Sequence, residues 1–217
     1  MKMEVICDLD LYIWHFYFGL PGMLNDIDIM WLSPLMNSIK IGRFPPKNVK
    51  YTIDGQEFDW LYFLADGVYP RNFKIFISTL LNASSKKDKL FCKMQEGARK
   101  CVERVFAVLF KRFGILNVPG RLWSEQEMGY VIKTCVILHN MCIKERRRNI
   151  VGDGVGGLRE DRIERELSGR YTNLKTHEKK EMLEAIGNRP SELYDDIDEC
   201  ERLTNALIEN LSKLYDN

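Results

Sequence analysis

The sequence predicts an α/β fold, because strand-like segments occupy the first part of the chain and two strong helices follow them. Residues 4–20 are rich in valine, isoleucine and aromatic side chains, which is typical of strands. Residues 60–65 form a short, almost continuous apolar run, which favours a strand buried on both faces. Residues 96–113 repeat apolar side chains at helical spacing. With 217 residues and 45% hydrophobic content, we expect one main domain plus an appendage.

Turn signals divide the strand-like segments. Residues 4–20 make one or two strands, closed by a glycine and then a Pro-Gly pair. Farther on, Asp54-Gly55 separates residues 49–53 from residues 57–65, and this dipeptide is typical of a hairpin turn. The second strand of the hairpin then ends at Asp66. We therefore expect Asp66 to lie at the rim of a sheet.

A short helix or a loop is expected between these strand regions, at residues 24–36. Asn25 or Asp26 is suited to be its N-cap, and Pro34 ends the segment. Asp26 and Asp28 follow a Pro-Gly turn. We interpret each of these acids as a capping residue rather than as part of a site.

The strongest predicted helix covers residues 96–113. Residues 71–81, before it, form a helix or a loop, and residues 82–89 form a polar, basic connector. The expected buried stripe of the helix consists of Cys101, Val102, Val105, Phe106, Val108 and Leu109. The opposite side is charged, so one face of this helix should pack and the other should meet solvent.

Two further helices are predicted after the strongest one. Residues 124–147 are apolar almost all round, which predicts a central position. Residues 151–157 are a glycine-rich linker, and residues 191–215 form the last helix. Its amphipathic seam comprises Leu193, Ile197, Cys200, Leu207, Leu211 and Leu214. We therefore expect a domain over residues 1–149 and a linker with a charged helical tail over residues 150–217.

The formal net charge of +1 is the sum of a basic body, residues 1–157, and an acidic tail, residues 158–217. Residues 1–157 carry 22 lysines and arginines against 16 acids, and residues 158–217 carry 10 against 15. The basic body is compatible with a polyanionic partner, although the excess is modest.

Targeting and cysteine signals point to a soluble, intracellular protein. No apolar stretch reaches the ~18 residues that a membrane helix needs. The start, MKMEVICDLD, carries acids where a signal peptide requires an apolar run. The six cysteines contain no Cys-x-x-Cys pair, so neither a disulfide framework nor a zinc ribbon is indicated. We expect a reducing compartment and no membrane.

Asp66 and Glu103 are the candidate metal ligands, and each has a structural alternative. Two-metal chemistry on nucleic acids needs several acids from separate elements, because hard oxygen atoms hold Mg²⁺ or Mn²⁺. Asp66 at a strand end could instead bond the backbone of its own turn. Glu103 could instead pair with Arg99 or Lys100 across one helical turn. The spacing alone favours the ion pair for Glu103 and leaves Asp66 open.

A cysteine and histidine set on the second helix is a weaker candidate. Cys135, His139 and Cys142 share one face at helical spacing, and zinc accepts all three side chains. A fourth ligand is not evident and the neighbours are apolar, so we favour packing. His15 and His177 receive no role.

Basic side chains on the predicted helices are candidate DNA contacts. The set on the strongest helix consists of Arg99, Lys100, Arg104, Lys111 and Arg112. A second set, Arg146 to Arg148, follows the next helix. They would contact phosphates, or else they form a solvated helix face.

Four motifs follow one another along residues 4 to about 149. They read DLYIWHFYFGLPGMLNDIDIMWLSPL, FLADGVYP, EGARKCVERVFAVLFKRFGIL and VIKTCVILHNMCI. In order and spacing they resemble the PIF/Harbinger-type transposases, in particular the plant-transposon-protein branch and the nucleases derived from them. The acidic tail from residue 150 resembles no part of that family.

The resemblance implies an RNase H-like core, a mixed sheet flanked by helices, with an Asp-Asp-Glu triad. Such a triad binds Mg²⁺ or Mn²⁺ and cuts or joins DNA strands. The resemblance also implies a location in the nucleus. Asp66 matches the second acid, in the LADG motif. Glu103 matches the third acid, in the VER motif. On this ground we favour the role of metal ligand for both.

The sequence departs from the family pattern in three ways. The first acid of the triad normally lies on a strand before residue 4, so we expect this sequence to begin after it and the sheet to lack its first strand. Asp8 and Asp10 lie on the following strand and are not matched to that acid. Ala107 replaces a glycine that is usual after the VER motif, and the expected DNA-binding segment is absent.

Three functional hypotheses result. The first is a transposase-derived nuclease whose ancestral activity is metal-dependent cleavage and strand transfer of DNA, with doubtful activity here because a ligand is missing. The second is a domesticated, non-catalytic module that binds DNA or uses its C-terminal helix to bind a protein. The third is a poorly stable product of an incomplete sheet.

Overall fold

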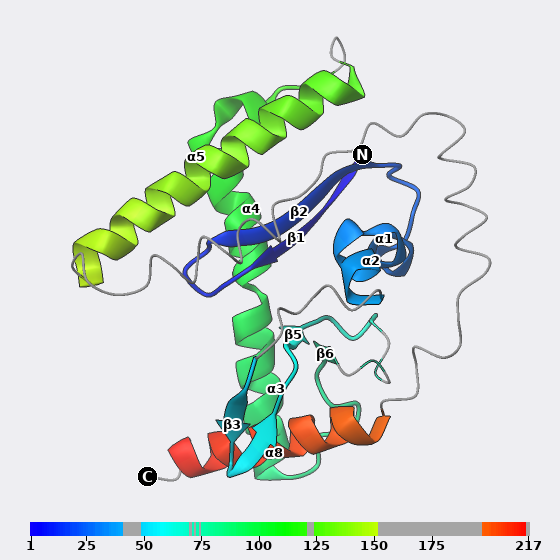
Figure 1. Cartoon of the computed structure of the whole chain (residues 1–217), viewed down its shortest axis with the longest axis vertical. Coiled ribbons are helices and arrows are strands. Elements are labelled where there is room, and N and C mark those ends of the chain that lie inside the picture. Colours follow the sequence, from blue (N-terminus) through cyan, green and yellow to red (C-terminus); the bar gives the residue numbers. More distant parts are fainter. Residues whose placement is uncertain are drawn as a thin grey trace. The chain divides into compact units, whose positions relative to one another are not determined.

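The computed structural model contains two compact units, which are described separately (Figure 1). It describes residues 1–40, 49–69, 71, 73, 75–120, 124–151 and 197–215. Unit 1 takes its described residues from Met1–Asn37 and Cys101–Glu184, and unit 2 takes its own from Ser38–Lys100 and Ala185–Asn217. Each unit combines segments that are distant in the sequence.

A long antiparallel hairpin forms the sheet of unit 1. Its strands are β1 (Lys2–Cys7) and β2 (Ile13–Leu20), so residues 4–20 do contain two strands. Figure 1 shows this hairpin in blue, beside the helices α4 (Cys101–Arg112) and α5 (Glu125–Val151). The core between them contains Ile13, Phe16, Val105, Leu109 and Val136.

Two short helices follow the hairpin. Helix α1 (Asp26–Leu32) begins after Asn25, whose side-chain Oδ1 accepts a hydrogen bond of 2.8 Å from the backbone N–H of Asp28. Asn25 is therefore confirmed as the N-cap, whereas Asp26 and Asp28, which were interpreted as capping residues, lie within the first turn of the helix. Helix α2 (Pro34–Lys40) begins at the proline, which is favoured at a first helical position.

Helix α5 confirms the second predicted helix but corrects its expected position. Ile137, Leu138 and Met141 are 49%, 44% and 60% exposed, so the helix is not buried all round. One face of the helix packs against β2 and α4, and Val136 and Ile143 are buried on this helix. The prediction from apolar composition overestimated how much of this helix is buried, because the described core touches only one side of it.

A small hairpin opens the described part of unit 2. Strands β3 (Tyr51–Ile53) and β4 (Gln56–Phe58) pair in antiparallel register around Asp54-Gly55. Both turn residues have positive φ, 51° and 77°, as the predicted Asp-Gly turn requires. The hairpin is confirmed, but its second strand ends at Phe58 and does not continue to Asp66.

The apolar run before Asp66 is not a long buried strand. Strand β5 is only Phe63–Leu64, and it pairs in parallel with β6 (Phe76–Ile77), which the sequence did not predict. Leu64 is 36% exposed, whereas Trp60 is buried. The run is apolar because its aromatic side chains pack into unit 2, and not because the segment lies in the middle of a sheet.

The strongest predicted helix is in fact two helices. Helix α3 (Lys86–Arg99) has Lys100 as its C-cap, and α4 begins at the next residue, Cys101. The start of α3 lies in the expected connector, where Ser85 and Asp88 form a capping box. The predicted stripe is confirmed for Cys101, Val105 and Leu109, which are buried, whereas its other three members, Val102, Phe106 and Val108, are only partly buried.

The C-terminal helix α8 (Ile197–Tyr215) is part of the core of unit 2. The buried cluster comprises Phe58, Trp60, Ile77, Phe91, Cys200, Leu203, Ala206 and Ile208. The predicted seam was partly wrong, because Ile197 and Leu214 are 50% and 65% exposed. Leu193, His177 and most of the predicted linker lie outside the described residues.

The sheets of the described segments are three separate strand pairs, β1–β2, β3–β4 and β5–β6. The α/β class is therefore confirmed, whereas the expected single mixed sheet is not present among these segments. Among the helices described, none combines the length and the apolar character that crossing a membrane requires.

Candidate functional site

Asp66 follows β5, and the chain around it is held by hydrogen bonds. Its backbone carbonyl accepts from the N–H of Tyr69 and from the hydroxyl of Ser78, both at 3.1 Å. One side-chain oxygen, Oδ1, accepts from the N–H of Gly67 at 2.6 Å. The turn role that the sequence left open is therefore present. The side chain is still 61% exposed.

Gln95 fixes the strand ends that lead to Asp66. This α3 side chain is 3% exposed, and its Nε2 donates to the carbonyls of Ala65 and Ile77, both at 2.9 Å. It thereby ties α3 to both strands of the β5–β6 pair, immediately before Asp66. Sequence reasoning missed this residue. The signal for it was a lone amide one helical turn after the buried Phe91.

Two of the predicted DNA-contacting cations lie next to carboxylates in unit 2. Arg99 places Nη1 3.6 Å from Oδ2 of Asp66, and Lys100 places Nζ 2.8 Å from Oε1 of Glu96. The Lys100 ammonium holds the pKa of Glu96 below its ordinary value, Arg99 adds to this effect, and the charge of Asp66 opposes it. Glu96 is thus a second carboxylate close enough to Asp66 for the two charges to interact, and the sequence analysis did not single it out.

The donor chemistry around Asp66 suits a hard divalent cation only in part. Asp66 and Glu96 offer exposed carboxylate oxygens, which are the ligands that Mg²⁺ and Mn²⁺ prefer. However, the described part of the chain contains no group of three or more histidine, cysteine, aspartate or glutamate side chains placed to hold a metal ion. The local arrangement is a carboxylate and cation cluster at the end of α3.

Glu103 lies in unit 1, in the first turn of α4, and its side chain is exposed. A carboxylate at this position is stabilised by the partial positive charge of the helix N-terminus. Arg104 and Lys111 are also exposed on α4. The predicted set of cations is thus divided, with Arg99 and Lys100 in unit 2 and the rest in unit 1.

His139, which is buried, and Arg112, which is exposed, form a partly buried contact rather than a metal site. Arg112 Nη1 lies 3.2 Å from His139 Nδ1, and His139 Nε2 lies 2.7 Å from the carbonyl oxygen of Leu11. Nε2 therefore carries the proton and donates it, while Nδ1 accepts. Burial lowers the pKa of His139, and the charges of Arg112 and Arg146 lower it further, whereas the bond to Leu11 opposes them.

The packing interpretation of the cysteine and histidine set is confirmed for two of its members. Cys135 and His139 are buried, at 5% and 0% exposure. Cys142 is exposed, so the packing interpretation does not hold for this third member.

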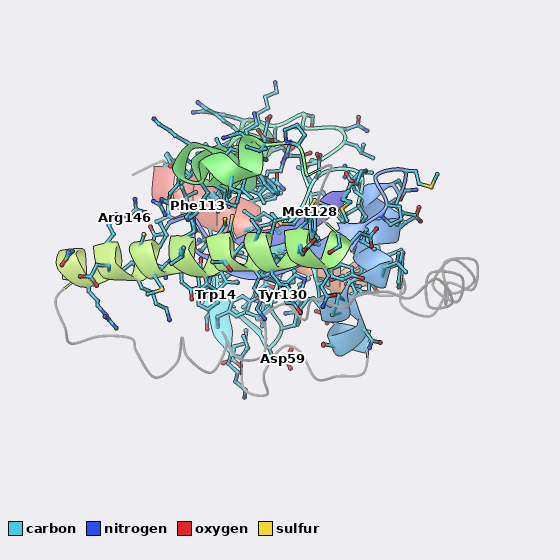
Figure 2. The ribbon with its side chains drawn as sticks, turned by 90° about the horizontal axis from the view of Figure 1, so that it is seen from above. Trp14, Asp59, Phe113, Met128, Tyr130 and Arg146 are labelled. Atoms are coloured by element: carbon cyan, nitrogen blue, oxygen red, sulfur yellow. The ribbon has the colours of Figure 1, made fainter. Side chains whose placement is uncertain are left out.

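The basic end of α5 is bound to the turn between β1 and β2. Arg147 reaches Oδ2 of Asp8 at 2.5 Å and Oδ2 of Asp10 at 3.2 Å, and Arg146 donates to the carbonyl of Asp10. Figure 2 shows Tyr130 toward the start of this helix and Arg146 toward its end. These arginines were predicted as phosphate contacts or as a solvated face, and they instead have intramolecular partners.

His15 has neighbours that the sequence did not reveal. Its Nε2 lies 3.4 Å from Glu4 Oε2 and 3.4 Å from Ser33 Oγ, and the ring is 3% exposed. Glu4 lies on the paired strand, so its approach depends on the register of β1 and β2. A single strand pattern cannot disclose such a neighbour.

Comparison with protein families places the chain among known proteins. The model of a family described as plant transposon protein matches residues 1–150. This match includes Asp66, Gln95 and Glu103. No curated protein and no solved structure matches the chain.

Proposed function

Because the chain belongs to the plant transposon protein family, we propose that it is a transposase-derived protein that acts on DNA, as the Harbinger-type transposases do. The observation that carries this proposal is the extent of the match, which spans residues 1–150 and so includes Asp66 and Glu103. An RNase H-like ancestry and a nuclear location go with this proposal.

The proposed ligands for divalent metal are Asp66 in unit 2 and Glu103 in unit 1. Both side chains are exposed carboxylates. The backbone carbonyl of Asp66 accepts from Tyr69 and Ser78, and Gln95 donates to the carbonyl of the preceding residue, Ala65. When bound, Mg²⁺ or Mn²⁺ would activate a nucleophile and stabilise the leaving oxygen of a phosphodiester. The part of this chain is to present the two carboxylates at accessible positions.

The proposed phosphate contacts are Arg99, Lys100, Arg104, Lys111 and Arg112. In unit 2, the cations neutralise acids that would otherwise repel a DNA strand. A phosphate oxygen could replace the Asp66 carboxylate at the Arg99 guanidinium, because an exposed ion pair contributes only about 0–1 kcal/mol. Arg99 would thus leave Asp66 when DNA arrives.

A second candidate function is a non-catalytic DNA-binding module. The contact between Arg99 and Asp66 favours it, because a guanidinium takes the place that a metal ion would need. The same basic residues would then bind phosphates, and the acids would only orient them. Association of the C-terminal helix with a protein partner remains a further prediction.

A cleavage assay with matched variants tests the nuclease proposal. The purified chain is incubated with fluorescently labelled duplex DNA and Mn²⁺ or Mg²⁺, beside Asp66→Asn, Glu103→Gln and Asp59→Asn. Asp59 is exposed on the same segment as Asp66 but is not a family acid, and it is labelled in Figure 2. We expect Asp66→Asn and Glu103→Gln to cleave DNA about 100-fold more slowly than the unaltered chain. Asp59→Asn should cleave it at the unaltered rate.

The same samples then distinguish the two proposals. Binding of the DNA is followed by fluorescence anisotropy at increasing salt, because phosphate contacts give an affinity that falls with ionic strength. Equal background cleavage in all four proteins, with salt-sensitive binding retained, would discard the nuclease and support the binding module. Absence of both cleavage and binding would overturn the proposal that the chain acts on DNA.

A further inference from the structure

We propose that Cys7 and Cys101 form a reversible disulfide, so that unit 1 contains a redox modification site. The two Sγ atoms lie 3.2 Å apart, at the last residue of β1 and the first residue of α4. Both cysteines are free thiols in the structure. This inference does not depend on the proposed function.

The packing of β1 against α4 brings the two thiols together. Met3, Val5 and Cys7 alternate along β1 and all pack against the core of unit 1, so Cys7 points to the side where α4 lies. A register shift between Ile6 and Cys7 moves the end of the strand relative to β2. A disulfide needs an S–S bond of about 2.05 Å, so the sulfur atoms must approach by only about 1 Å.

The surroundings make the two thiols unequal. The hydrogen bond from Cys7 lowers the pKa of Cys101 to about 7, with further help from the charge of Arg104 and against burial and Asp8. The same contact and burial raise the pKa of Cys7. Cys101 also begins a helix, where a thiolate is favoured. Cys101 is therefore the nucleophile, and Cys7 is the thiol that resolves its oxidised form.

The oxidant is a small hydroperoxide, such as hydrogen peroxide. The Cys101 thiolate attacks one oxygen and breaks the O–O bond, which gives a sulfenic acid and a hydroxide ion that takes up a proton to become water. The Cys7 sulfur then attacks the Cys101 sulfur and displaces the second oxygen, and the Cys7 proton leaves with it as water. Two thiols and one peroxide thus give one disulfide and two water molecules.

The cross-link would join positions that are 94 residues apart and would fix the first turn of α4. Glu103 lies in that turn, two residues after Cys101. Oxidation should therefore restrict unfolding of unit 1, because the closed loop lowers the entropy of the unfolded chain. A raised thermal midpoint is the expected physical consequence.

Mass spectrometry of the peroxide-treated chain tests the proposal directly. We expect the purified protein to lose about 2 Da and two of its six free thiols, and a non-reducing digest to contain a peptide that links Cys7 to Cys101. Dithiothreitol should restore both thiols. Cys142→Ser, which removes an exposed thiol, should form the same link. Cys7→Ser should instead accumulate oxygen on Cys101.

The wild-type digest alone decides the matter, whether or not the variants fold. A link between other cysteines, or oxidation of Cys101 without a link to Cys7, would overturn the proposal. The oxidised wild-type chain should also unfold several degrees higher than the reduced chain. An unchanged midpoint would discard the proposed restriction of unit 1.

Discussion

Polar side chains that are half-buried or buried organise the loops of this protein at the scale of single residues. Asp8 accepts from the backbone N–H groups of Asp10 and Tyr12 and from the indole of Trp14, so one carboxylate shapes the turn between β1 and β2. His139 holds the same turn through the carbonyl of Leu11. Removing such a partner leaves a buried group without its hydrogen bond, which costs more than the bond itself contributes.

Protonation of His139 should destabilise unit 1. The pKa of His139 is lowered in the folded chain, so at pH below about 6.5 the unfolded chain binds more protons than the folded one. The free energy of unfolding should therefore fall as the pH is lowered from 7.5 to 5.5, by at most about 1.4 kcal/mol per pH unit from this group. Urea unfolding at several pH values measures the slope.

His139→Gln isolates this contribution, because glutamine keeps a donor for Leu11 but does not titrate. The variant should show a shallower fall of the free energy of unfolding over the same pH range. An identical slope in both proteins would mean that other groups cause the pH dependence.

At the scale of elements, short strands depend on the helix beside them. Strands β5 and β6 share only two residue pairs, which is too little for a stable sheet by itself. Gln95 adds two hydrogen bonds from α3 to the ends of both strands. The helix thus keeps Asp66 in place, although neither strand is long enough to do so.

Gln95→Met should lower the free energy of unfolding of unit 2 by about 1–3 kcal/mol, because the carbonyls of Ala65 and Ile77 lose their buried donor. The matched control is Gln126→Met, at an exposed position of α5, where we expect a change within about 0.5 kcal/mol. Chemical denaturation compares the two. Equal effects would show that the bonds of Gln95 do not hold the strand ends.

At the scale of the whole molecule, each unit combines segments from distant parts of the sequence. Unit 2 contains α3 and α8, and Lys87 on the first forms an ion pair of 2.7 Å with Glu209 on the second. Arg202 of α8 covers the Phe58 ring at 4.6 Å and the Trp60 ring at 5.5 Å. The C-terminal helix is therefore a structural part of unit 2, although the family match ends at residue 150.

Leu203→Ala should destabilise unit 2 by about 2–5 kcal/mol, because this side chain is fully buried and its removal leaves a cavity. Leu214→Ala makes the same chemical change at a position that is 65% exposed, and we expect little effect. Hydrogen exchange of α3 and β6 reports the loss. If both variants exchange alike, the C-terminal helix does not stabilise unit 2.

Local signals allowed much of the secondary structure to be predicted. The Asp-Gly pair specified the β3–β4 turn, Asn25 capped α1, and apolar spacing specified the buried face of α4. The sequence also contained the capping box at Ser85, but the basic composition of residues 82–89 led us to predict a connector there instead of the start of a helix. The motifs around Asp66 and Glu103 identified the family, because motifs depend on residue order alone.

The sequence by itself determined the α/β class, most helix faces and the family of this protein. Only the tertiary structure decided that α8 belongs to unit 2, that Gln95 holds the approach to Asp66, and that Cys7 meets Cys101. The physical reason is that helical and turn propensities act over a few residues, whereas these contacts join residues far apart in the chain. They depend on how already formed elements pack, which no local pattern specifies.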